Sequence, residues 1–250
     1  MPKNLRKYIY LVGIALFWAL VWQIASMLAG QELLLPSPLS TARALWALMG
    51  TRSFWQSAAY TIIRVMGGYA LGVMAGAALG IACALSPLLD RLLSPIRSVV
   101  KATPVTSFIL LVLLWLTTGL TPLFVAFLIV LPVVWANVLE GMRAADPHLL
   151  EMARAFHMRR ADVIRHIYIP FLEPYFTAAC ATALGLAWKA GVAAEVIASP
   201  ALSIGRSIYE SKLYLETADL FAWTVVVVAL SMTLERLVLW LFRLMKGGRP

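Results

Sequence analysis

Apolar residues gather into six segments along the chain, separated by short polar connections. The segments run over about 8–29, 58–85, 105–118, 122–139, 174–198 and 220–242. A helix needs about 20 apolar residues to cross the hydrocarbon core of a bilayer. The third segment is shorter than that, and Pro104 predicts a kink if its helix begins before the proline. The pattern predicts an all-α polytopic membrane protein with six transmembrane helices.

Composition agrees with a lipid-facing surface. Of the 250 residues, 62% are hydrophobic and 13% are charged, and mean hydropathy is +0.84. A soluble domain carries about 45–50% apolar and about 25% charged residues, so one soluble core cannot account for this chain. Cys83 and Cys180 lie inside apolar segments and are interpreted as small buried hydrophobes.

Basic residues are unevenly divided between the two sets of connections. Fourteen Lys and Arg lie in the N-terminal segment, the second and fourth connections and the C-terminal segment, against four in the other connections. Basic residues favour the cytoplasmic side, which places both termini in the cytoplasm and residues 31–56 and 199–219 outside. The net charge of +9 therefore reflects membrane topology, and no nucleic-acid partner is expected.

Five charged residues fall within predicted spans. Glu235 and Arg236 lie near the inner end of the sixth span and are interpreted as interface charges, whereas Arg64, Lys189 and Glu195 lie deeper. A charge at the centre of a span costs about 2.5–3.5 kcal/mol, so each should face the bundle interior or reach an interface. Lys189 and Glu195 are six residues apart, about 9 Å along a helix, and should each find a partner on another helix. Arg64 and Glu195 both lie toward the outer side and are candidates to pair. Two interpretations stay open: fixed ion pairs, or a gate or lining of a translocation path.

Small residues recur every four positions in the second span, at Gly68, Gly72, Gly76 and Gly80. Such a row lets a second helix approach closely. It suits either fixed packing or a face that slides against a partner helix.

The largest cytoplasmic connection predicts an amphipathic helix from about 148 to 158. Asp146-Pro147 supplies an N-cap and a first-turn proline. A second short helix is predicted over 161–169 and is expected to stop at Pro170. The first helix could lie on anionic lipid, stay solvated, or dock to a protein partner. Its apolar stripe consists of Leu149, Met152, Ala153 and Phe156, with Glu151 off the stripe.

The same segment carries a family motif. Glu151-Met152-Ala153, then His157, then nine residues, then Ile-Tyr-Ile-Pro at 167–170 resembles the pattern E-A-A-x3-G-x9-I-x-L-P. That pattern marks the membrane subunits of binding-protein-dependent ABC importers. Met152 and His157 depart from it, and His157 stands where the family usually has glycine. Further similarities at 35–38, 64–72, 146–147 and 187–195 extend the resemblance over nearly the whole chain, nearest to the sulfonate, taurine, nitrate and bicarbonate permease group.

The resemblance implies a type I ABC importer permease architecture in the bacterial cytoplasmic (inner) membrane. Residues 1–250 would form one transmembrane permease domain with a coupling segment at about 146–170. Two copies would assemble with two ATPase subunits and one external solute-binding protein, and the cargo would be a small polar or anionic solute. ATP and Mg²⁺ would be bound by the ATPase, with no cofactor in this chain. The coupling residues would be Glu151, Leu149, Met152, Ala153, Phe156 and His157.

Other classes of function have less support. The chain has no glycine-rich phosphate loop and no internal repeat. His148, His157 and His166 are nine residues apart, which is not metal-ligand spacing on a helix, so neither a catalytic nor a metal site is expected. The prediction is a transport subunit rather than an enzyme. An ion-driven secondary transporter or channel is the alternative, because Lys189 and Glu195 would suit it.

Overall fold

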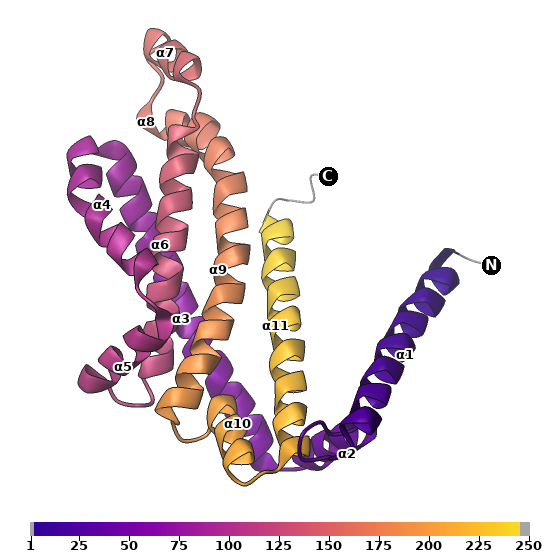
Figure 1. Ribbon diagram of the computed structural model, residues 1–250. Helices are drawn as coiled ribbons and strands as arrows, with labels where there is room; N and C mark the ends of the chain where they lie inside the picture. The colour runs from indigo at the N-terminus through magenta and orange to yellow at the C-terminus, as the bar shows by residue number, and fades with distance from the viewer. Residues whose placement is uncertain (1–2, 246–250) are drawn as a thin grey trace.

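The computed structural model describes residues 3–245, with side chains at 13–14 and 16–244. Over these residues the chain is helical and has no strands (Figure 1). The helices are α1 (Lys3–Ala29), α2 (Pro38–Met49), α3 (Arg52–Leu85), α4 (Pro87–Ala102), α5 (Val105–Trp115), α6 (Thr121–Arg143), α7 (Pro147–Ala155), α8 (Arg160–Val163), the π turn η1 (Ile164–Tyr168), α9 (Ile169–Ala198), α10 (Ile204–Leu213) and α11 (Thr217–Met245).

Four helical stretches are long and apolar enough to cross a membrane: Arg52–Leu85, Thr121–Arg143, Arg160–Ala198 and Thr217–Leu244. The α4–α5 pair qualifies as a fifth if it forms one broken span. The first predicted span lies in α1, whose described apolar part, Leu16–Ala29, is shorter. The polytopic all-α prediction is confirmed, and the six-helix arrangement is consistent with these stretches.

The third predicted span differs most from the observed elements. α5 ends at Trp115, and an unpredicted helix, α4, precedes it at an angle of 105°. The break falls where Pro104 forms the N-cap of α5. Proline has no backbone N–H and disfavours helical geometry at the residue before it, so the predicted kink is a full break between two helices.

The prediction that a short helix stops at Pro170 is wrong. α8, η1 and α9 follow one another without a gap, and Pro170 lies in the first turn of α9. The fifth span therefore begins well before the predicted residue 174. A π turn interrupts the regular i to i−4 hydrogen bonding of the helix. Proline, which has no backbone N–H to donate, can therefore follow it without ending the helix.

The core of the bundle is formed mainly by α3, α6 and α9, with Leu234 and Val238 of α11. The glycine row of α3 packs directly on α6. A Cβ added at Gly72 would lie 2.7 Å from the Cβ of Val130, and one added at Gly80 would lie 2.7 Å from the Cβ of Val138. The predicted close approach is confirmed. The sliding interpretation of this face stays a prediction.

The bundle has two distinct ends (Figure 1). α7 and α8 stand at one end, here called the α7 end, and α11 runs toward that end. α2 and α10 lie at the other, here called the α10 end. α1 leans away from the bundle but is held at the α10 end by two hydrogen bonds. The indole of Trp22 donates to the carbonyl oxygen of Pro36 at 3.1 Å, and the hydroxyl of Ser26 donates to the carbonyl oxygen of Leu35 at 2.9 Å.

Candidate coupling segment and intramembrane charges

The predicted cytoplasmic helix is present as α7. The carboxylate of Asp146 accepts the backbone N–H of His148 at 2.8 Å, and Pro147 occupies the first helical turn. The first N–H groups of a helix have no partner within the helix. Asp146 accepts one of them, and proline has no N–H that needs a partner. α7 ends at Ala155, three residues before the predicted end.

The turn after α7 explains the motif position at His157. The N–H of Met158 donates to the carbonyl oxygen of Ala153 at 2.9 Å, and that of His157 to Arg154 at 3.1 Å. These two bonds form a Schellman motif, which requires a left-handed residue at the position that His157 occupies, and its φ is 50°. Glycine is the usual choice there, but histidine is among the residues that tolerate this region. The departure from the family pattern therefore keeps the turn.

The structure divides the predicted apolar stripe. Ala153 is 3% exposed and packs in a cluster with Ala145 and Ile167, against which Leu149 is half-buried. These contacts hold α7 on the rest of the α7 end.

The outer part of the stripe is free. Met152 is 45% exposed and Phe156 is 75% exposed. Glu151 is also exposed, with a carboxylate oxygen 4.0 Å from Nδ1 of His148. α7 is therefore anchored along one side and presents two large apolar groups and a carboxylate on the other.

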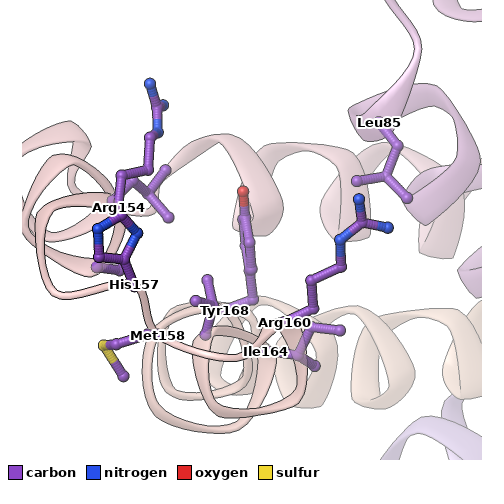
Figure 2. A pocket seen from close by; sticks show the side chains of 10 residues that line it. Leu85, Arg154, His157, Met158, Arg160, Ile164 and Tyr168 are labelled. Atoms are coloured by element: carbon purple, nitrogen blue, oxygen red, sulfur yellow. The ribbon is translucent and has the colours of Figure 1, made fainter.

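A hollow of about 780 Å³ lies between α7 and α8. Figure 2 shows Arg154 and His157 on one side of Tyr168 and Arg160 on the other. The remaining lining residues are apolar: Leu85, Leu150, Ala153, Met158, Val163 and Ile164. The α7 end thus combines exposed apolar groups with a basic-rimmed hollow.

Glu195 is fully buried near the C-terminal end of α9. Its carboxylate accepts the hydroxyl of Thr61 at 2.8 Å, the N–H of Gly205 at 3.2 Å and Nη1 of Arg64 at 3.4 Å. The predicted Arg64–Glu195 pair is confirmed. A buried carboxylate needs such compensation, and here it comes from α3 and from the N-terminus of α10, whose dipole also favours negative charge.

The same network holds the loop between α9 and α10. Arg64 also donates to the carbonyl oxygens of Ala201 and Leu202, both at 3.1 Å. Thr61 accepts the N–H of Ile204 at 3.0 Å. Two α3 side chains therefore bind α9, the loop and α10 together.

Sequence reasoning missed two members of this network. Thr61 lies one helical turn before Arg64, so helix spacing could have indicated that both share a face. Gly205 gave no such signal, because its role depends on how closely α10 approaches α9: an added Cβ would lie 2.6 Å from the backbone nitrogen of Val196.

Lys189 does not join the network. Its side chain is exposed, and none of the side chains that the structure describes pairs with it. The expectation that Lys189 has a partner on another helix is wrong for this chain alone. Within residues 3–245, no group of three or more His, Cys, Asp or Glu is placed to hold a metal ion.

Known proteins resemble this chain over most of its length. The family model described as "Binding-protein-dependent transport system inner membrane component" matches residues 68–247. The taurine transport system permease protein of Escherichia coli is 25% identical, covering 94% of this chain and 87% of that protein. The bicarbonate and nitrate permease proteins of Synechococcus elongatus are each 26% identical, covering 97% of this chain and 93% and 91% of theirs.

A solved structure supports the fold. The crystal structure of an amino acid ABC transporter with histidines aligns with a TM-score of 0.58 at 17% identity, covering 76% of this chain and 90% of that chain. The family match begins inside α3, at residue 68, and includes α7 and the Lys189 and Glu195 positions of α9.

Proposed function

Since the chain belongs to the family of binding-protein-dependent transport system inner membrane components, we propose that α7 is the element through which an ATPase subunit drives it. Members of this family are permease subunits of ABC importers rather than enzymes, and they work with ATPase and binding-protein partners in the inner membrane.

The assembly that we propose contains two copies of this permease, two ATPase subunits and one external binding protein. ATP and Mg²⁺ are bound by the ATPase subunits, and this chain holds no cofactor. The α7 end and both termini face the cytoplasm, which the excess of Lys and Arg in those segments supports. The α10 end then faces the binding protein.

The cargo that we propose is a small polar or anionic solute. Relatives that align over most of this chain are named for taurine, bicarbonate and nitrate. These solutes are small, and each carries a negatively charged group. In ABC importers of this family the binding protein delivers such a solute to the outer mouth of the permease.

The observation that carries the coupling proposal is the exposure of Phe156 at the end of an anchored helix. A large aromatic group that is 75% exposed beside an exposed Met152 gains by entering a partner's groove. Ala153 and Leu149 keep α7 in place, so a force on Phe156 reaches the start of α9 through the packed cluster. Glu151 can form a charge-assisted bond at the rim, and His157 sets the turn that positions Phe156.

Arg64 and Glu195 serve the opposite end in this proposal. Their bonds to the loop and to α10 favour a role in holding α3, α9 and α10 as one unit, so that a movement begun at α7 reaches the outer loops. A path or gate role for this pair has less support, because Glu195 is fully buried.

Co-purification with the ATPase subunit tests the coupling role. An aromatic side chain can bury 150–250 Å², so the exposed part of Phe156 offers about 150 Å², worth roughly 4 kcal/mol at about 25 cal/mol/Å² before binding costs. Phe156→Ala should therefore weaken ATPase binding at least tenfold. Tyr214→Ala removes a ring that is 69% exposed at the α10 end and should leave binding unchanged.

The two variants separate the alternatives. Loss of ATPase binding in Phe156→Ala alone supports coupling through α7. Equal retention of the ATPase in Phe156→Ala and in the parent protein would leave Phe156 on lipid or in solvent and overturn the proposal. Solute uptake driven by an ion gradient, in vesicles without any ATPase, would favour the secondary-transporter alternative.

A further inference from the structure

One face of α9 is left uncovered by the rest of the chain that the structure describes. Its exposed positions are Thr182, Leu186, Lys189, Ala193 and Ile197, which follow one another at intervals of three or four residues. An added Cβ at the neighbouring Gly185 would meet nothing within 4 Å, so the space beside this face is open.

Two neighbouring helices border this face. On one side the indole of Trp188 donates to the carbonyl oxygen of Val227 on α11 at 3.0 Å. On the other side Ala190 and Ala194 pack with Ile109 of α5. The uncovered face thus lies between the contacts that α9 makes with α5 and with α11.

Lys189 lies at mid-depth on this face. It is nine residues from Ala198, the last residue of α9, which is about 13.5 Å along the helix. That is close to half of the roughly 30 Å hydrocarbon core. A lysine at this depth needs a counter-charge or water, and a lipid-facing position supplies neither.

Among residues 3–245, no carboxylate lies at the depth of Lys189. Glu195 is nearest along α9, but it is fully buried and already accepts three hydrogen bonds. Asp219 lies at the α10 end of α11, and Glu235 is 18 residues from Thr217, about 27 Å along the helix. Glu140 and Glu173 lie toward the α7 end of α6 and α9.

A second copy of the permease does not remedy this. Two copies with the same orientation in a membrane place identical residues at identical depths. Because the chain has no carboxylate at the depth of Lys189 among the described residues, a second copy brings none to that depth either. The counter-charge must come from outside the permease.

We propose that this face of α9 lines the translocation path and that Lys189 attracts an anionic cargo, or an anionic group of the cargo, at mid-membrane. The proposal rests on the proposed function as an importer permease and narrows its polar or anionic cargo to one that carries a negative charge. A single cation among small and aliphatic side chains gives a site that favours negative charge without the several ligands that would trap the ion.

Cysteine labelling in membrane vesicles tests the path and the charge together. Ala193→Cys places a thiol one helical turn from Lys189, with Cβ atoms about 6 Å apart. The probes are two thiosulfonate reagents of similar size, one anionic and one cationic. The buried native Cys83 and Cys180 in the parent protein give the background.

The anionic reagent should react faster than the cationic one at Ala193→Cys. Adding Lys189→Gln should reduce the ratio of the anionic to the cationic rate about tenfold. One positive charge at about 6 Å attracts one probe and repels the other, and the two effects together give about this factor even at the dielectric constant of bulk water. Lys189→Arg should keep the ratio. Lys212→Gln, which removes an exposed lysine of α10, should also keep it.

Two results would overturn the proposal. An absence of labelling at Ala193→Cys means that lipid or a second copy covers the face. An anionic preference that survives Lys189→Gln means that Lys189 is not its source. Co-purification of the ATPase with the same variants is scored separately, so a failed anion site with retained ATPase binding leaves the importer assignment intact.

Discussion

Removing the carboxylate of Glu195 should loosen the α10 end more than any exposed ion pair does. Glu195→Ala leaves the Thr61 hydroxyl, the N–H of Gly205 and the Arg64 guanidinium without their acceptor in a buried site. Removing one partner of a buried pair costs about 3–5 kcal/mol, because the other charge stays buried and uncompensated. Arg64 keeps its bonds to the carbonyl oxygens of Ala201 and Leu202, which favours the lower end of that range.

Glu195→Gln should be milder and is the informative second variant. Its amide oxygen can take the place of the carboxylate oxygen that both Thr61 and Gly205 donate to, while its NH₂ group turns toward Arg64 and cannot accept from it. The variant then loses mainly one charged hydrogen bond, worth about 1.5–3 kcal/mol. The expected order of stability is parent, Glu195→Gln, Glu195→Ala.

Thermal unfolding in detergent measures the order. A loss of 1 kcal/mol lowers Tm by about 2–4 °C for a chain of 150–250 residues, so Glu195→Ala should lower it by roughly 10 °C. The control is Glu210→Ala, which breaks a pair with Arg206 that is shorter, at 2.7 Å, but about half exposed. Exposed pairs contribute about 0–1 kcal/mol, so this control should move Tm by no more than a few degrees. Equal shifts for Glu195→Ala and Glu210→Ala would refute the reasoning that burial decides the cost.

Two further pairs of substitutions test close packing and the turn after α7. Gly72→Ala places a Cβ 2.7 Å from the Cβ of Val130 and should lower stability by about 1–3 kcal/mol through overpacking. Gly185→Ala enters open space and should raise stability by up to about 1 kcal/mol through helix propensity. Shifts in Tm of the same sign for both variants would contradict the packing argument. His157→Gly should relieve the backbone strain of the left-handed conformation at φ 50° by up to about 1 kcal/mol, and His157→Val should increase that strain. Trypsin should therefore cut at Arg159 more slowly in His157→Gly and faster in His157→Val than in the parent protein. The reverse order of cleavage would show that the turn does not depend on this residue.

Much of the fold follows from patterns that act over a few residues. The long apolar segments predict the spans because each must satisfy its own backbone hydrogen bonds in lipid. Asp146-Pro147 predicts the start of α7, and Pro104 predicts a break, because capping and the missing proline N–H are local effects. The glycine row likewise indicates a close helix contact before the partner, α6, is known.

The same local rules failed where neighbouring elements changed their outcome. Pro170 does not end a helix, because a π turn ahead of it leads straight into α9. The four-residue stripe of α7 does not form one docking face, because Ala153 turns toward Ile167 and only Met152 and Phe156 remain exposed. A hydrophobic stripe read from the sequence does not say which part of it the chain itself will cover.

The intramembrane charges show the same division most clearly. The sequence alone determined that Arg64, Lys189 and Glu195 are costly in a membrane and must be compensated. Only the tertiary structure decided that Glu195 is compensated within the chain and that Lys189 is not, because that depends on how α9 is rotated against α3, α10 and α11. Helical periodicity gives the spacing of side chains around one helix, whereas packing between helices determines which of them is buried.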